Sequence, residues 1–502
     1  MLWLSLLFPQ FPLEVLTQGA ALQAAPRAII EGECVLLADA AAGAAGVVPG
    51  MRLAAAWAHQ PALVVLERRP DIEAAALARL ACWAGGFTPE VCLAGEHGLL
   101  LELSACVRLF GGQTVMLKAV LDACLAQGFS VRHALAPTPL AASWLAMAGA
   151  ATPCLGMENL RQRVADLPVG VLANTTEIAA RIQAFGVTRV GDLLTLPRAS
   201  LMRRIGATPM LALSKALGEL PDLRPRFIFP EQFCETLELP ARIEHTAALL
   251  YAAQALVAAL CGWLTIRASG IAVCMLWLEH ERGRDKAESA TCVELRFAEP
   301  TRDATRITRV LRERLERLRL SASVVVMRLE AAKVQALPGR DGQLFGRGNG
   351  GNGSHVESSA VGALVERLQA RLGEGSVLQT TMIADHRPEC ASRLVPWSAP
   401  DGVTSGVTSG VTSAAESRFA PRPFWLLPKP EALGEINGRP QRHGQLELIS
   451  GPERIESGWW DANEQDALGD VQRDYFVARS IRREWLWIFR TPSGWFLHGV
   501  FA

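Results

Sequence analysis

The chain has 502 residues, more than a single hydrophobic core usually supports, so we expect several domains. Half of the residues are hydrophobic and the formal net charge is zero, which neither favours nor excludes a nucleic-acid partner, because a neutral chain can carry a local basic face. The eleven cysteines form no Cys-x-x-Cys pair and no His/Cys cluster, as is typical of a reducing compartment. No apolar stretch reaches the ~18–20 residues of a membrane span, so we expect a soluble, cytoplasmic protein.

Residues 1–165 have the pattern of an α/β unit. The chain opens with a short apolar run, Leu2–Phe11, and a second such run, Gly95–Ser104, is bounded by a turn-former, as buried strands often are. Further strands and helices follow from apolar runs and helical spacing, with strands at Arg27–Ile30 and Cys34–Ala38 and helices over 71–84, 113–127 and 138–149.

These two runs resemble the palm of the Y-family (translesion) DNA polymerases. That family has an acid on its first strand and later a Ser-Ile-Asp-Glu-Ala-Tyr-Leu-Asp segment. If Leu101-Glu102 is set on the final Leu-Asp, His97 and Gly98 stand at the Asp-Glu pair, and Leu7 stands at the metal-binding Asp of the first strand. Two-metal phosphoryl transfer needs carboxylate oxygens that bridge two Mg²⁺ ions. The resemblance therefore implies a polymerase-like protein that is not an enzyme and has no metal or other cofactor.

A second hypothesis is an active translesion polymerase with displaced metal ligands. The candidate carboxylates are Glu96, Glu102 and Asp39, and none of them lies at a matching position. Glu96 is one residue away from His97, so on a strand its side chain would point to the opposite face.

The nucleotide-binding positions of the family are also altered. Asp39–Met51 resembles the family segment Ser-Tyr-Glu-Ala-Arg-x-x-Gly-Val-x-x-Gly-Met, in which the Tyr and the Arg hold the incoming triphosphate. Here Ala40 and Gly43 stand at those two positions, while Gly46 and Gly50 are kept. The resemblance thus implies a preserved frame without nucleotide binding.

Residues 166–230 and 231–338 resemble the thumb and the little finger of the same family. In the thumb, the usual Gly-x-Gly of the helix-hairpin-helix is Ala173-Asn174-Thr175, so a plain helical packing unit is an equal alternative. Residues 231–338 have the order β-α-β-β-α-β of the little finger, which lays its sheet on duplex DNA. The strand residues Arg328 and Lys333 are the predicted DNA contacts.

Residues 339–420 have the composition of a linker. A helix is expected over 359–373, and the Gly-Val-Thr-Ser repeats of Gly402–Ser413 lack the residues that build a core. The segment Asp341–Gly346 resembles the Gln-Leu-x-Leu-Phe ligands of bacterial sliding clamps. An exposed Leu-Phe pair in a glycine-rich linker has no core to join, so we predict clamp binding by Gln343, Leu344 and Phe345.

Residues 421–502 are rich in tryptophan, and their alternation predicts a β-hairpin around 492–494. Three segments resemble the C-terminal region of the ImuB proteins, polymerase-like subunits of a bacterial mutagenesis complex: Gly451–Trp460, Arg473–Phe476 and Trp495–Ala502. The candidate partner-binding residues are Trp459, Trp460, Tyr475, Trp485, Trp487 and Trp495. The alternative is a small β domain whose aromatic residues form its core, since aromatic residues serve cores and interfaces alike.

The resemblance as a whole implies an α+β multidomain adaptor of DNA-damage-induced translesion synthesis and mutagenesis. Its partners would be the sliding clamp, a RecA-like protein of the ImuA type and an error-prone C-family DNA polymerase. DNA would be held through its backbone without base reading, and hence in a salt-dependent way. A scaffold that binds no nucleic acid is the third hypothesis.

Overall fold

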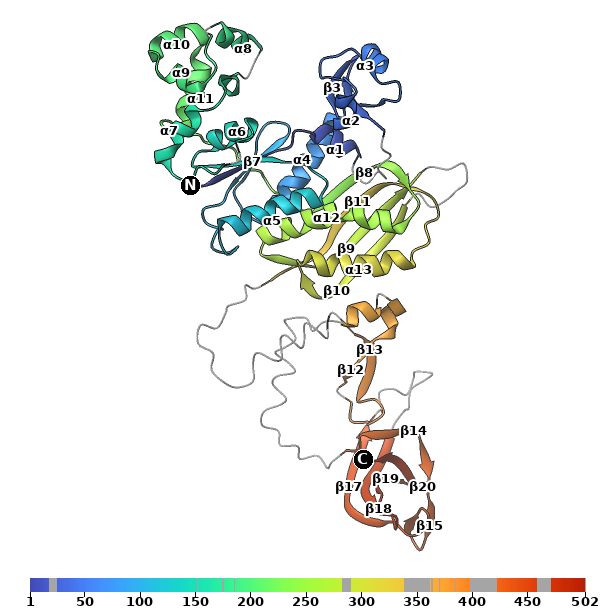
Figure 1. The fold of residues 1–502 in the computed structure, drawn as a ribbon. Coiled ribbons are helices and arrows are strands. Elements are labelled where there is room, and N and C mark those ends of the chain that lie inside the picture. The colour runs from blue at the N-terminus through green and yellow to red at the C-terminus, as the bar shows by residue number, and fades with distance from the viewer. Residues whose placement is uncertain are drawn as a thin grey trace. The chain divides into compact units, whose positions relative to one another are not determined.

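The computed structural model describes residues 1–17, 25–150, 152–173, 176–184, 186–281, 290–337, 362, 364–369, 371–383, 385–397, 422–457 and 471–501. The chain divides into two compact units, Met1–Arg371 and Leu372–Ala502 (Figure 1). The first unit mixes helices and sheets and the second is rich in strands, so the predicted α+β multidomain class is confirmed.

A four-stranded antiparallel sheet contains the N-terminal strand of the chain. Its order is β5-β6-β1-β7, with β1 in the interior of the sheet. The strands are β1 (Trp3–Leu7), β5 (Val91–Leu93), β6 (Gly98–Glu102) and β7 (Arg132–Ala136). Because successive residues of a strand face opposite sides, Leu4 and Leu6 join one core cluster and Trp3 joins another.

Helices cover both faces of this sheet. The helices α4 (Pro70–Ala84) and α5 (Gln113–Ala126) pack on the Leu4 face, while α6 (Pro139–Met147) packs on the Trp3 face. All three were predicted within a few residues of their bounds. The short helix α1 (Phe11–Thr17) follows β1 and was not predicted.

A small three-stranded sheet, of order β3-β2-β4, has its own core. Its strands are β2 (Arg27–Glu31), β3 (Cys34–Ala38) and β4 (Val64–Glu67), and its helices are α2 (Ala40–Ala44) and α3 (Leu53–His59). The predicted strands at Arg27–Ile30 and Cys34–Ala38 are confirmed.

Short helices follow α6 and extend the core of the Trp3 face. These are α7 (Met157–Ala165), the 3-10 turn η1 (Val169–Leu172), α8 (Thr176–Gln183), α9 (Val190–Leu194), α10 (Arg198–Ile205) and α11 (Ala207–Ala216). Gly186 and Gly206 lie between consecutive helices with φ of +68° and +96°, a backbone conformation that glycine adopts without strain.

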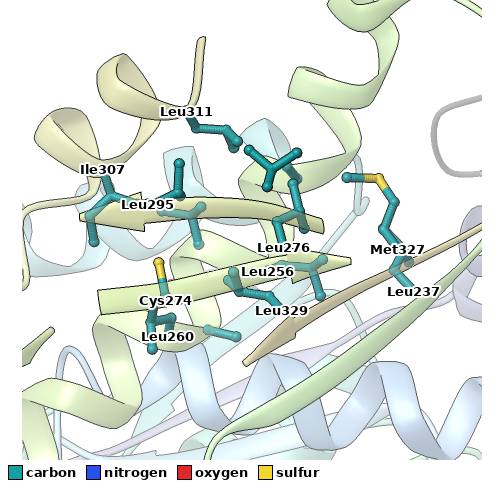
Figure 2. Close-up of a cluster of buried hydrophobic side chains, with 14 of the residues drawn as sticks. Leu237, Leu256, Leu260, Cys274, Leu276, Leu295, Ile307, Leu311, Met327 and Leu329 are labelled. Carbon is teal, nitrogen blue, oxygen red and sulfur yellow. The ribbon is translucent and has the colours of Figure 1, made fainter. Parts of the chain in front are cut away.

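Residues 234–336 have the predicted β-α-β-β-α-β order, which is thereby confirmed. The elements are β8 (Cys234–Ile243), α12 (Thr246–Ile266), β9 (Ser269–His280), β10 (Ala290–Thr301), α13 (Ala304–Arg317) and β11 (Val324–Ala336). The strands form an antiparallel sheet of order β10-β9-β11-β8. Figure 2 shows Leu276 and Leu329 of the sheet beside Leu256 and Leu260 of α12 in the buried core.

The expectation that no apolar stretch reaches the length of a membrane span is wrong. Helix α12 has 21 residues and no Asp, Glu, Lys or Arg, so by length and composition alone it could span a membrane. In the structure it packs between the sheet and α4, and a helix buried on several sides is apolar around most of its circumference. A side chain on Gly262 would place its Cβ 2.1 Å from the Cys82 carbonyl oxygen, so glycine permits this close crossing.

Among its described residues, the predicted helix over 359–373 is helical at 362, 364–369, 371 and 372. Up to Arg371 it belongs to the first unit, and its anchor is a buried ion pair. Both oxygens of Glu366 bind the Arg306 guanidinium of α13, and Oε1 also accepts a hydrogen bond of 2.6 Å from the Ala298 backbone N–H.

The second unit contains a five-stranded antiparallel sheet of order β14-β20-β19-β18-β17. Its strands are β14 (Trp425–Ala432), β17 (Glu447–Ser457), β18 (Val471–Arg479), β19 (Trp485–Thr491) and β20 (Gly494–Val500). The predicted hairpin is confirmed, with Thr491 opposite Gly494. Two smaller strand pairs complete this unit: β12 (Leu378–Met382) with β13 (Ser392–Pro396), after the turn η2 (Glu374–Ser376), and β15 (Gly434–Ile436) with β16 (Arg439–Gln441). The β12–β13 pair corrects the expectation of a continuous linker there.

Candidate functional site

Two of the three positions predicted to be degenerate catalytic positions lie side by side in the β5-β6-β1-β7 sheet. Leu7 at the end of β1 is the direct cross-strand partner of Gly98 at the start of β6. The Phe8 backbone N–H donates a hydrogen bond of 2.9 Å to the carbonyl oxygen of His97 and extends this pairing. The ends of these two strands therefore meet, and neither Leu7 nor Gly98 offers an oxygen ligand from its side chain.

The backbone around Gly98 also leaves no room for a side chain. A Cβ atom built there would lie 2.8 Å from the Ala94 carbonyl oxygen and 3.2 Å from that of Leu6. Both neighbours are backbone atoms, so they can withdraw only if the strands shift. A carboxylate at this position is thus incompatible with the present strand pairing.

The third degenerate position, His97, has its side chain on the other face of the sheet. Its ring lies 5.6 Å from that of Phe11 in α1, and its Nε2 is 3.2 Å from Oε2 of Glu73 in α4. The structure therefore does not bring the His97 side chain to Leu7 and Gly98.

Glu73 is a buried charged residue that the sequence analysis did not identify. Its carboxylate binds the Arg68 guanidinium, which also binds Glu31 and Glu96. The sequence did contain a signal, because Glu73 precedes Leu77, Leu80 and Ala84 at helical spacing on the buried stripe of α4. This cluster has one arginine for its three carboxylates, and the hydrogen bonds that the guanidinium donates to them raise the pKa of Arg68, with Glu73 as the largest cause.

The three carboxylates considered for a displaced metal site do not converge. Glu96 lies in the turn before β6, and a hydrogen bond of 2.6 Å from Arg68 lowers its pKa. Glu102 accepts hydrogen bonds from the backbone N–H groups of Leu2 and Ser104. Asp39 accepts a bond of 2.7 Å from the Ala42 N–H and caps α2. Across the described parts of the chain, no three or more His, Cys, Asp or Glu residues are grouped as a metal ion would require.

The positions predicted to be degenerate nucleotide-binding positions lie on helix α2. Ala40 and Gly43 are both exposed, and a Cβ on Gly43 would meet nothing within 4 Å. Gly46 and Gly50, the positions kept from the family segment, have φ of +93° and +85°. The two glycines thus adopt the backbone conformations that favour glycine, and the predicted nucleotide-binding positions carry no polar side chain.

The two predicted DNA contacts on the little-finger-like sheet differ in their surroundings. Arg328 pairs with Glu330 and lies 4.0 Å from Glu279, and its guanidinium lies over the Trp277 ring at 5.4 Å. Lys333 is exposed near the end of β11. A phosphate contact by Arg328 would require its ion pair to open, whereas Lys333 is accessible as it stands.

Most of the described aromatic candidates in the second unit belong to its core. Tyr475, Trp487 and Trp495 are buried, and the Tyr475 hydroxyl lies 2.7 Å from His498 Nδ1. This corrects the expectation that they contact a partner directly, because each is enclosed by neighbouring strands. Trp485 is 44% exposed and stays a predicted partner contact, while the 71% exposed Trp425 is a further candidate that the predicted set omitted.

Several predicted residues lie outside the part of the chain that the structure describes. They are the clamp-binding residues Gln343, Leu344 and Phe345, the repeats of Gly402–Ser413, the tryptophans Trp459 and Trp460, and Asn174 and Thr175 of the thumb hairpin.

Comparison with known proteins gives matches in sequence and in fold. Residues 7–147 match the impB/mucB/samB family. The Protein ImuB of Caulobacter vibrioides, strain NA1000, is 27% identical over 484 residues, which cover 91% of this chain and all of that protein, and the ImuB of a second strain matches equally. Among solved structures, DinB from Sulfolobus solfataricus is 14% identical and covers 66% of this chain and 98% of its own, with a TM-score of 0.38. An insertion ternary complex of Dbh DNA polymerase is 16% identical and covers 67% of this chain and 100% of its own, also with a TM-score of 0.38.

Proposed function

We propose that this chain, which is similar to Protein ImuB over 91% of its length and to the impB/mucB/samB family over residues 7–147, is a non-catalytic adaptor of translesion synthesis and mutagenesis. In this role it joins the sliding clamp, a RecA-like ImuA-type protein and an error-prone C-family polymerase at damaged DNA. The C-family polymerase makes the phosphodiester bonds.

The observation that carries this proposal is the pairing of Leu7 with Gly98. In-line phosphoryl transfer by two metals needs carboxylates at the meeting point of these two strands. An aliphatic side chain on one strand and a closed backbone on the other supply none. The nearby carboxylates Glu96, Glu102 and Asp39 are held by an arginine or by backbone N–H groups, which argues against the alternative of an active polymerase with displaced ligands.

Contact with DNA is a further part of the proposal. The exposed ammonium group of Lys333 suits a phosphate, and Arg328 could follow if its pairing with Glu330 opens. Such contacts read no bases, so binding is expected to be independent of sequence and to weaken with added salt.

Clamp binding by Gln343, Leu344 and Phe345 can be tested by capture of the full chain on immobilised sliding clamp. We expect Leu344→Ala/Phe345→Ala to abolish capture, because the Leu-Phe pair would fill an apolar pocket on the clamp. The matched control is Leu372→Ala, which truncates an exposed leucine outside the motif and should leave capture unchanged. Equal capture of the double variant and the wild type would rule out this contact.

The adaptor role itself is tested by reconstituting lesion bypass from purified components. We expect the C-family polymerase to extend a primer past a lesion only when this chain, the ImuA-type protein and the clamp are present. Bypass of equal extent without this chain would contradict the proposal.

A further inference from the structure

A cavity of about 490 Å³ in the first unit is surrounded by helices α5, α12 and α13, which Figure 1 labels. Its lining includes Trp83 near the end of α4 and Val257 of α12, both of which are buried. Ala126 of α5 and Ala304 of α13 also line it and are exposed, and their short side chains leave the cavity open to solvent. Its volume lies within the ~300–1,000 Å³ that is typical of binding sites. The cavity thus has an apolar floor that is accessible from outside.

Two arginines of α13 give the rim of this cavity a positive charge. Arg309 and Arg312 both line it and are exposed, and they are one helical turn apart. Among the described residues, no Asp or Glu lines the cavity and neither arginine forms an ion pair. Glu313, which follows Arg312 in the chain, binds Arg371 at 2.7 Å, and that hydrogen bond is the main cause of its lowered pKa, with a smaller contribution from Arg312. The two guanidinium groups are therefore available to an external carboxylate.

We propose that this cavity docks an amphipathic helix of a partner protein, in which a stripe of acidic residues runs beside a stripe of apolar ones. The apolar side chains would enter the cavity over Trp83, and the carboxylates would pair with Arg309 and Arg312. An apolar centre within a polar rim is the usual arrangement of a protein interface, and a helix in a groove is a recurring mode of recognition. Because the two arginines are one turn apart, they match carboxylates that are one turn apart on the partner helix.

The surface beyond the cavity favours a protein segment over a small anionic molecule. Tyr251 is 50% exposed and precedes the cavity residue Gln254 by three positions, so the two lie on the same side of α12. A Cβ on Gly128 would lie 3.8 Å from the Tyr251 hydroxyl, which places this tyrosine beside the end of α5. The accessible surface therefore continues along α12 past the cavity, and tyrosine is a residue type enriched in protein interfaces.

The cavity also lies away from the predicted DNA contacts. Helices α12 and α13 share one core cluster with the sheet and cover one of its faces. Arg328 stands between the buried Met327 and Leu329 on β11, so its side chain points to the opposite face. A duplex on that outer face would leave the cavity open. This docking adds a partner surface to the adaptor role, but its test uses neither clamp nor polymerase, so its failure would leave that role untouched.

The test is fluorescence anisotropy with the full chain and a labelled fifteen-residue peptide. The peptide has leucine at positions 4, 8 and 11, glutamate at positions 5, 9 and 12, and alanine or glutamine elsewhere, so that the two stripes are adjacent on a helix. One control peptide has lysine in place of glutamate, and another has serine in place of leucine. We expect only the first peptide to bind, with an affinity that falls as salt is added.

Variants of the chain locate the binding. Arg309→Glu/Arg312→Glu should weaken binding by about tenfold or more, because two attractive pairs become repulsive. Arg309→Gln/Arg312→Gln should weaken it less strongly and serves if the charge reversal fails to fold. Ala126→Trp should weaken binding by filling the cavity without a change of charge.

The matched control makes the same change of charge outside the cavity. Arg302→Glu/Arg319→Glu alters exposed arginines beyond the two ends of α13 and should bind the peptide like the wild type. The proposal is overturned if the first peptide does not bind, if the charge-reversed variant or Ala126→Trp binds it normally, or if the control variant weakens it equally. It is also overturned if duplex DNA displaces the peptide and itself loses affinity on charge reversal, which would assign the two arginines to phosphate.

Discussion

At the scale of single residues, two glycines at degenerate family positions have opposite surroundings. A Cβ on Gly98 would meet two carbonyl oxygens at 3.2 Å or less, whereas a Cβ on Gly43 would meet nothing within 4 Å. We expect Gly98→Ala to destabilise the first unit by ~1–3 kcal/mol through overpacking. Gly43→Ala, within helix α2, should instead stabilise it by about 0.5–1 kcal/mol. Urea unfolding midpoints of the two variants measure this, and a Gly98→Ala protein as stable as the wild type would show that the strands can separate freely.

The candidate site could be predicted from the sequence only where a local motif marks the position. The family frame located Leu7 and Gly98, and the strands do pair there. No local sequence pattern predicts the contact between His97 and Glu73, because the two residues are 24 positions apart in the chain. Arg328 and Glu330, by contrast, are two residues apart on one face of β11, so their pairing is a local feature that the sequence could have shown and that the prediction omitted.

At the scale of elements, one ion pair anchors the 364–369 helix to the first unit. Glu366→Ala would leave the Arg306 guanidinium buried without its carboxylate, at a cost of ~3–5 kcal/mol. We therefore expect the variant to release this helix, seen as faster amide hydrogen exchange over residues 364–369. The control is Arg371→Ala, which breaks a solvent-exposed ion pair with Glu313 and should leave the exchange of residues 364–369 nearly unchanged. Unchanged exchange in Glu366→Ala would mean that other contacts hold the helix.

A second prediction at this scale concerns the crossing of α12 and α4. Replacing a helical glycine with alanine normally stabilises a helix by about 0.8–1 kcal/mol. At Gly262 we expect Gly262→Ala to lower the thermal unfolding temperature instead, because its Cβ would overlap the Cys82 carbonyl oxygen. An increase in that temperature would show that α12 and α4 do not pack this closely.

The elements that could be predicted are those with a strong periodic pattern. The long helices and the β-α-β-β-α-β order follow from apolar spacing over ten or more residues. The strands that were missed are β5, which has only three residues, and β12 and β13, which lack the apolar run that marks β2 and β3 at the same length of five residues. The length of the apolar stretch in helix α12 was underestimated from the sequence. Its nearly uniform apolar composition reflects burial on several sides by elements that are distant in the sequence.

At the scale of the whole molecule, the second unit should be sensitive to acid. Burial lowers the pKa of His498, although Glu389 nearby partly offsets the shift. The unfolded chain, with a histidine pKa near ~6.5, then binds more protons than the folded one below that pH. Stability contributed by neutral His498 is therefore present above about pH 6.5 and is lost as the pH falls toward its folded-state pKa.

The comparison of His498→Gln with the wild type isolates this effect. We expect the unfolding midpoint of the second unit to fall less between pH 7 and pH 5 in the variant, measured by the fluorescence of its tryptophans. Equal slopes for the two proteins would show that His498 titrates alike in the folded and unfolded chains.

The central claim is that a polymerase-like fold has lost the ligands for its two metal ions. The most direct measurement is single-turnover primer extension by the purified full chain with Mg²⁺, dNTPs and primed template. We predict no incorporation above that of a no-protein control. Sustained incorporation that Leu7→Arg abolishes would contradict the account.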